Sequence, residues 1–294
     1  MPSLIGDFGH YLDQQGKSEN TLKAYHRDLV DFTGWWEEQV GEVFNPNAVD
    51  ARDVVNYRTA LIKVGAKPST INRRLTVVKL FYDWGRRHGH LTNTPFELLE
   101  RVRVATVKNI APRWLDKNEQ AALRRAVRGS SNPRDLAIIE VMMGAGLRIS
   151  EVVNLEVSDL TIKERSVDVR IRALAKETKE RTVPLDNRTR QALSAWLKVR
   201  DETMGPQVFY GQRGAITDRA VDYLVRKYAY QAKLEDVSAH TLRHTFGKNL
   251  VDAGVSLDQV AMLMGHESLE TTKIYTMPSP ADLHKAVRKA GGEL

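Results

Sequence analysis

Residues 238–275 read SAHTLRHTFGKNLVDAGVSLDQVAMLMGHESLETTKIY, and this stretch decides how the whole chain is interpreted. A helix that begins near His240 places His240, Arg243 and His244 on one face, because residues three and four positions apart are neighbours on a helix. The opposite face carries the apolar side chains Leu242, Phe246 and Leu250. The stretch therefore predicts an amphipathic helix whose polar face presents an arginine and two histidines.

Serines and a glycine predict two further short helices after the first one. Ser256 is a suitable N-cap for a helix that ends at Gly265, and Ser268 can cap the next. His266 follows the closing glycine, so we expect it at an exposed turn. Tyr275 is expected near the end of the third helix. The three helices together would bring cationic, proton-carrying and phenolic side chains to one place.

This combination of side chains suits a phosphate. Arginine presents a planar set of N–H donors that matches phosphate oxygens and keeps its charge, and histidine can donate to such an oxygen or carry a proton near neutral pH. A zinc site is the alternative, because His240 and His244 lie four residues apart. Thr241 stands where the helical zinc-protease pattern has glutamate, and the chain has no cysteine, so we expect no metal.

The joint pattern resembles the C-terminal signature of the tyrosine site-specific recombinases, a family that includes phage integrases and Xer-type recombinases. The pattern is His-x-x-Arg-His, then Met-Gly-His, then a tyrosine nine residues later. The resemblance implies that His240, Arg243 and His266 are catalytic, and that Tyr275 is the nucleophile. It also implies a mainly α fold with a small antiparallel β-sheet, in two domains.

Two upstream motifs fit the same family. Residues 144–151 read GAGLRISE and resemble its first arginine motif, so Arg148 is expected to be catalytic with Glu151 as its supporting carboxylate. Residues 167–171 alternate in polarity and predict a strand that returns at residues 182–185. The tip resembles the family's hairpin with a catalytic lysine. Counting back from residues 180–185 places that lysine at Lys176, and Lys179 is the alternative because the usual flanking glycines are absent.

The N-terminal part predicts a helical DNA-binding domain. Residues 1–105 follow helical spacing, and this pattern resembles the family's core-binding domain. The helix after Pro68 carries a basic face with the DNA-binding candidates Arg73, Arg74 and Lys79. Residues 106–113 are expected to be a basic linker, and residues 114–294 the catalytic domain. A last short helix over residues 281–290 can dock onto a neighbouring subunit, as in the family, or fold back on its own.

Composition agrees with a DNA-binding protein of the cytoplasm. The 294 residues carry a formal net charge of +7, and 42% of them are hydrophobic, enough for a packed core. Cysteine is absent, which fits a reducing compartment. We expect no secretory signal, because residues 1–7 contain neither a basic region nor an apolar one. We expect no membrane partner, because the longest apolar run, residues 136–147, is too short to span a bilayer and contains Glu140.

The resemblance implies DNA cleavage and rejoining through a 3′-phosphotyrosyl link, in a homotetramer on duplex DNA. The two arginines and His266 would neutralise the phosphate oxygens while Tyr275 attacks phosphorus. Lys176 would protonate the leaving 5′-oxygen, with His240 as the base for the tyrosine. The link conserves the bond energy, so no cofactor is expected. The alternatives are a type IB topoisomerase and a non-catalytic DNA-binding protein of the same fold.

Overall fold

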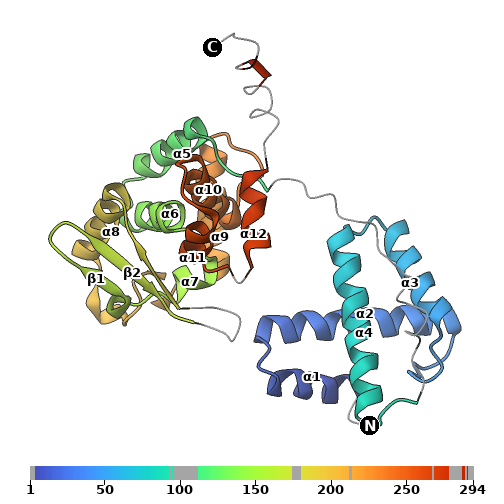
Figure 1. Cartoon of the computed structure of the whole chain (residues 1–294). Coiled ribbons are helices and arrows are strands. Elements are labelled where there is room, and N and C mark those ends of the chain that lie inside the picture. Colours follow the sequence, from blue (N-terminus) through green and yellow to red (C-terminus); the bar gives the residue numbers. More distant parts are fainter. Residues whose placement is uncertain are drawn as a thin grey trace. The chain divides into compact units, whose positions relative to one another are not determined.

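The chain forms two compact units, Met1–Ile110 and Ala111–Leu294. The structure is a computed structural model that describes residues 4–92, 95, 112–173, 180–211, 214–266, 268–277, 287, 288 and 290. Most of the expected linker 106–113, and most of the expected terminal helix 281–290, lie outside these residues. The expected mainly α fold with a small antiparallel sheet is confirmed (Figure 1).

The N-terminal unit is built from helices. Its described helices are α1 (Leu4–Gln14), α2 (Glu19–Val40), α3 (Ala51–Lys63) and α4 (Pro68–Arg87). Local signals set their beginnings: the Ser18 hydroxyl accepts the N–H of Thr21 at 3.3 Å, and Pro68 occupies the first turn of α4. The sequence analysis did not single out α1, which packs against α2 and α4.

Aromatic side chains fill the core of this unit. Phe8, Phe32, Trp36, Phe81 and Tyr82 are buried, and Phe8 meets Phe81 edge to face with ring centroids 5.6 Å apart. Burial on one face of α4 follows the helical spacing expected from the sequence. The sequence placed Arg73, Arg74 and Lys79 on the opposite face of α4. Lys79 is exposed, whereas Arg73 and Arg74 reach Asp28, which is fully buried.

The C-terminal unit adds a small sheet to a set of helices. Its described elements are α5 (Lys117–Gly129), α6 (Pro133–Ala145), α7 (Ile149–Val153), β1 (Leu160–Ile162), β2 (Val167–Ile171), β3 (Arg181–Pro184), α8 (Asn187–Val199), β4 (Tyr210–Gly211), β5 (Gly214–Ala215), α9 (Asp218–Gln231), α10 (Ala239–Asp252), α11 (Leu257–Met264) and α12 (Leu269–Lys273). The 3₁₀ turns are Val157–Asp159, Glu202–Met204 and Ile274–Thr276.

Helix α6 lies at the centre of this unit, in contact with α5, α8, α9 and α10 (Figure 1). It is buried along most of its length, so it has no amphipathic pattern. The helix ends at Gly146, whose φ of 62° is left-handed, and a Cβ there would lie 2.2 Å from the ring of Phe246. Only glycine fits this turn, which directs the following residues toward α10.

The predicted hairpin is present, with one strand more than expected. Strands β2 and β3 pair antiparallel with Val169 opposite Val183, and β1 pairs antiparallel on the other side of β2. The segment between β2 and β3 includes Lys176 and Lys179, and both lysines lie outside the described residues. No helix in the described part of the chain is long and apolar enough to cross a membrane.

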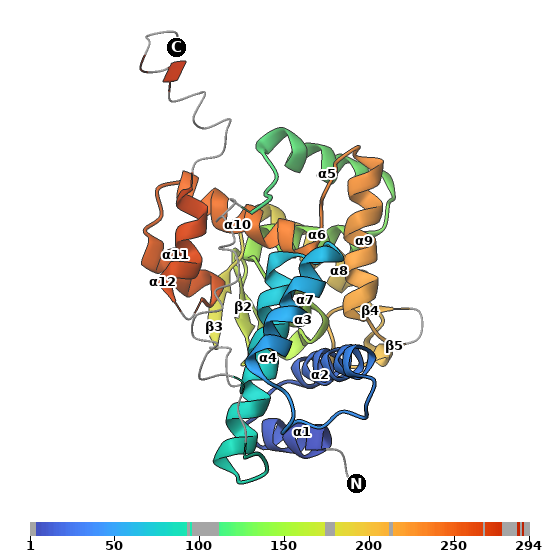
Figure 2. The same ribbon diagram turned by 90° about the vertical axis from the view of Figure 1, so that its right-hand side faces the viewer.

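Helix α10 begins close to His240, as expected, and α11 and α12 begin after the serines predicted to cap them. Ser238, Ser256 and Ser268 are the N-cap residues, and Gly265 closes α11 with a φ of 62°. Figure 2 shows α11 beside α10 and α12 beside α11, in agreement with their contacts, and the 3₁₀ turn after α12 also contacts α10. Tyr275 lies in the 3₁₀ turn that continues α12 and not in the helix proper.

Candidate active site

Glu151 and Arg148 are fixed to each other at the start of α7. The Glu151 carboxylate accepts the backbone N–H of Arg148 at 2.7 Å and its Nη1–H at 3.0 Å, so Glu151 both caps the start of α7 and holds the guanidinium. The Nη2 of Arg148 donates to the carbonyl of Gly265 at 3.0 Å. The Arg148 side chain stays 31% exposed, which leaves part of its guanidinium open to a ligand.

Arg181 is a third arginine of this cluster, and the sequence analysis missed it. Its Nη1 and Nη2 donate to the two carboxylate oxygens of Glu151, both at 2.8 Å, and its Nε donates to Leu263 O. Its side chain is only 7% exposed. The available signal was strand alternation, because Arg181 shares a face with buried Val183, and a charge on an inward face needs a partner.

Arg243 is buried on α10, next to the apolar face predicted for this helix. It donates to the carbonyls of Gly146 and Met264, and its Nη1 lies 3.9 Å from the Glu151 carboxylate. Burial and the neighbouring charge of Arg148 lower the pKa of Arg243 to about 10, while Glu151 opposes this effect. Arg243 therefore remains a cation at neutral pH, held by three segments of the chain.

Glu151 is the only carboxylate that contacts these arginines within the described residues. Burial alone would raise the pKa of Glu151, but the hydrogen bonds and charge of Arg181, together with the Arg148 N–H, lower it below its ordinary value. One anion thus faces three cations. The surplus of positive charge is what a bound phosphodiester would neutralise.

Tyr275 is buried beside α10, with 1% of its surface exposed. Its hydroxyl lies 3.0 Å from Nδ1 of His244, and its ring lies parallel to that of His266, with centroids 6.1 Å apart. Burial raises the pKa of the phenol to about 12, although the charges of Arg243 and Arg148 act in the opposite direction. The phenol is therefore neutral and enclosed in this state.

The two predicted catalytic histidines occupy different environments. His266 is half-buried where an exposed turn was expected, and its Nδ1 lies 2.8 Å from Oγ1 of Thr272. Burial and the charges of Arg243 and Arg148 lower the pKa of His266 to about 4. His240 is exposed, and its ring centroid lies 6.4 Å from that of His244. The histidine that contacts the phenol is thus His244.

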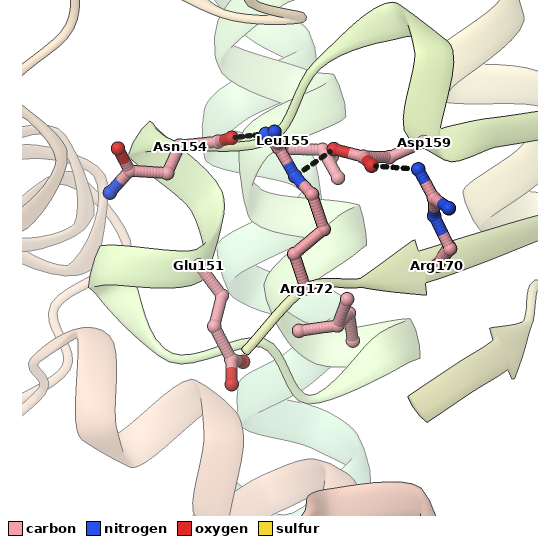
Figure 3. A pocket seen from close by; sticks show the side chains of 7 residues that line it. Glu151, Asn154, Leu155, Asp159, Arg170 and Arg172 are labelled. Carbon is pink, nitrogen blue, oxygen red and sulfur yellow. Dashed lines mark hydrogen bonds and ion pairs between the residues drawn. The ribbon is translucent and has the colours of Figure 1, made fainter. Parts of the chain in front are cut away.

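The strand that leads toward the lysine-bearing segment is anchored next to Glu151. The Arg172 guanidinium donates to the carbonyl of Asn154 at 2.8 Å and pairs with Asp159 at 3.1 Å, and Arg170 pairs with the same carboxylate (Figure 3). Asn154 directly follows α7, so these contacts join the end of β2 to the helix that carries Glu151. Glu151 lines the same small polar pocket.

The predicted DNA-binding residues of the N-terminal unit differ in whether their charges are paired with carboxylates. Arg73 pairs with Asp28, which is fully buried, while Arg74 lies 3.8 Å from Asp28 and pairs with Asp31. Lys79 is exposed and has no ion pair within the described residues. Two of the three cations are therefore engaged by carboxylates of the same unit.

Comparison with known proteins identifies the class. The family described as "Phage integrase family" matches residues 113–281, and "Phage integrase, N-terminal SAM-like domain" matches residues 5–89. The chain therefore belongs to the phage integrase family, as its motifs predict, and the expected class of activity, site-specific tyrosine recombination, is confirmed.

Individual relatives agree with this assignment. The chain is 32% identical to tyrosine recombinase XerC of Thermodesulfovibrio yellowstonii, over 91% of this chain and 88% of that protein. It is 31% identical to tyrosine recombinase XerC of Corynebacterium glutamicum, over 99% and 92%. Among solved structures, XerH bound to palindromic difH in a post-cleavage complex shares the fold, with a TM-score of 0.77 at 20% identity over 91% of this chain and 79% of that one.

Proposed function

We propose that this recombinase cleaves one strand of duplex DNA with Tyr275, keeps the 3′-end as a phosphotyrosine, and transfers it to a second duplex. The observation that carries this proposal is the cluster of three guanidiniums around the carboxylate of Glu151. The phenol of Tyr275 lies near this cluster, because the charges of Arg243 and Arg148 act to lower its pKa. A phosphodiester anion would restore the balance of charge at this point.

Each side chain of the site has a proposed role in that reaction. Arg148 and Arg243 neutralise the charge that gathers on the non-bridging oxygens of the transition state, and His266 and His240 donate hydrogen bonds to the same oxygens. Lys176 protonates the leaving 5′-oxygen, with Lys179 as the alternative. Removing one preorganised donor typically lowers the rate by about 10²–10³-fold.

Arg181 has a positioning role in this scheme. It touches Glu151 with both Nη atoms and the end of α11 with Nε, so it holds the carboxylate that orients Arg148. Gly265 lies directly over this guanidinium, since a Cβ there would come within 2.7 Å of its Nη1.

DNA is the proposed partner, and the names of similar proteins support it. XerH is bound to its difH substrate, and the Tn1549 transposon integrase to a circular intermediate DNA. On α4 we propose Arg73, Arg74 and Lys79 as contacts to the DNA backbone, with Lys79 the strongest because no carboxylate among the described residues engages its ammonium. Strand exchange between two duplexes implies a homotetramer on DNA, acting in the cytoplasm.

A covalent trapping assay tests this function. Nicked duplexes tiled across the DNA that flanks the gene would be incubated with the wild-type chain and with Tyr275→Phe. We expect a covalent protein–DNA adduct with the wild-type chain and none with the variant, while both bind the DNA equally. Deletion between two directly repeated sites on a plasmid is expected as well. Relaxation without deletion would favour the topoisomerase, and binding without an adduct would favour a non-catalytic protein.

A further inference from the structure

Two residues of helix α10, His244 and Gly247, contact Tyr275 and have no role in the reaction proposed above. His244 and Gly247 lie one turn apart on it, and the Tyr275 ring packs where Gly247 has no side chain. A Cβ on Gly247 would come within 2.7 Å of Cζ of the tyrosine. The ring is thus placed by a glycine, and its hydroxyl by the Nδ1 of His244 at 3.0 Å.

Neither of the other two histidines is placed to take the proton of this hydroxyl. His266 meets the phenol face to face, with an angle of 11° between the rings, and its Nδ1 contacts Thr272. His240 is exposed and reaches the tyrosine only through His244. A proton acceptor must lie within about 2.6–3.2 Å of the donor atom, and His244 meets this condition.

The surroundings of His244 keep it ready to accept a proton. Its titratable neighbours are His240 and Arg243 on the same helix, Tyr275 on the 3₁₀ turn and His266 after α11. Burial and the charges of His240 and Arg243 lower the pKa of His244 to about 4, so the imidazole is neutral at physiological pH. The phenol, with a pKa of about 12, keeps its proton until a phosphate anion arrives and favours the imidazolium.

We propose that His244 is the general base that accepts the Tyr275 proton during DNA cleavage, in place of His240. The bond from the tyrosine oxygen to phosphorus forms, the bond from phosphorus to the 5′-oxygen breaks, and the phenolic proton moves to Nδ1 of His244. The 5′-oxygen takes its proton from the lysine of the β2–β3 segment. In the reverse step the imidazolium returns its proton to the tyrosine. This inference rests on the proposed function.

The test isolates the nucleophile from the leaving group. Single-turnover cleavage is measured on a nicked site whose scissile 5′-oxygen is replaced by sulfur, because a thiolate leaves without a proton. The variants are His244→Asn, which keeps a hydrogen-bond acceptor but cannot carry the proton, His244→Ala, and His240→Ala as the rival base. His10→Ala, an exposed histidine of α1, is the control. Thermal unfolding shows whether each variant is folded.

We expect wild-type cleavage to be nearly independent of pH and both His244 variants to be slower by about 10²–10⁴-fold at neutral pH. Their rates should rise about tenfold per pH unit, because hydroxide must then generate the phenolate. Fluorinated tyrosine at position 275, with its lower pKa, should restore part of the rate in His244→Asn.

Other outcomes overturn the inference. If His244→Asn keeps the wild-type rate and flat pH profile, His244 only positions the phenol. If His240→Ala gains the pH dependence instead, the base is His240. If the wild-type chain forms no adduct at all, it is the proposed function that fails, which separates the two results.

Discussion

Both units bury carboxylates against arginines, and two of these clusters, around Asp28 in the N-terminal unit and around Glu151 in the C-terminal unit, differ in their balance of charge. In the N-terminal unit Asp28 is completely buried and contacts Arg73 and Arg74, and Asp31 supplies a second carboxylate to Arg74. Two cations face two anions there. The arginine side chains remain 35% and 22% exposed, so water shares in their solvation.

In the C-terminal unit the carboxylate of Glu151 faces three arginines, and two of these are almost completely buried. Burying an excess of like charge is unfavourable unless something supplies the missing counter-charge. An excess of buried guanidinium charge around Glu151 favours the binding of an anion, which the balanced pairs of Arg73 and Arg74 with Asp28 and Asp31 do not require. The comparison therefore separates these two clusters by their balance of charge.

The largest expected effect concerns the carboxylates themselves. Glu151→Gln leaves three guanidiniums without their counter-ion and is expected to lower the free energy of unfolding by about 3–5 kcal/mol. Asp28→Asn is expected to cost less, about 1.5–3 kcal/mol, because its arginines can turn toward water. Urea denaturation followed by circular dichroism measures both, with the exposed Glu164→Gln as the matched control.

The effect of Glu151→Gln on stability should also depend on pH. Because the folded state lowers the pKa of Glu151 below its ordinary 4.5, the stability it contributes is complete above that value and is lost as the pH falls below it. The difference in stability between wild type and Glu151→Gln should therefore shrink in acid. Equal losses for Glu151→Gln and Asp28→Asn, or a difference that grows in acid, would contradict the distinction between the clusters.

The sequence predicted what depends on neighbours along the chain. The N-caps at Ser256 and Ser268 appear where the sequence predicted them, because a cap is decided within a few residues. The hairpin followed from alternation of polarity, and buried α4 positions from helical spacing. The strand β1 was not anticipated, since a strand of three residues gives a weak periodic signal, and helix α1 was not singled out although its apolar residues follow helical spacing.

Contacts between distant residues could not be predicted in this way. Arg181 meets Glu151 across 30 residues, and His244 meets Tyr275 across 31, so only the tertiary fold brings them together. His244 was placed on the polar face of its helix, but nothing in its spacing tied it to the phenol. His266 was expected to be exposed because it follows a helix-ending glycine, yet the packing of α12 half-buries it.

A third prediction tests whether the surplus positive charge around Glu151 is used in catalysis. Arg243→Lys keeps the positive charge but loses the planar set of donors that contacts both Gly146 and Met264. We expect single-turnover cleavage of a nicked site to fall by about 10²–10³-fold, with DNA binding little changed. Arg165→Lys, in the exposed turn between β1 and β2, is the control. Wild-type cleavage by Arg243→Lys would mean that this guanidinium only supports the fold.

The smallest expected effect concerns the free and engaged cations of α4. Lys79 is exposed without an ion pair in the described part of the chain, whereas Arg74 is engaged by Asp28 and Asp31. Each phosphate contact releases counter-ions, so losing one reduces the slope of log K against log salt by about 0.9. Lys79→Gln should produce this reduction in titrations with a duplex site, and Arg74→Gln a clearly smaller one together with a loss of stability.

The opposite order would mean that DNA displaces the carboxylates from Arg74, so that the balanced cluster is also part of the binding surface. Unchanged slopes in both variants would place the DNA backbone away from this face of α4.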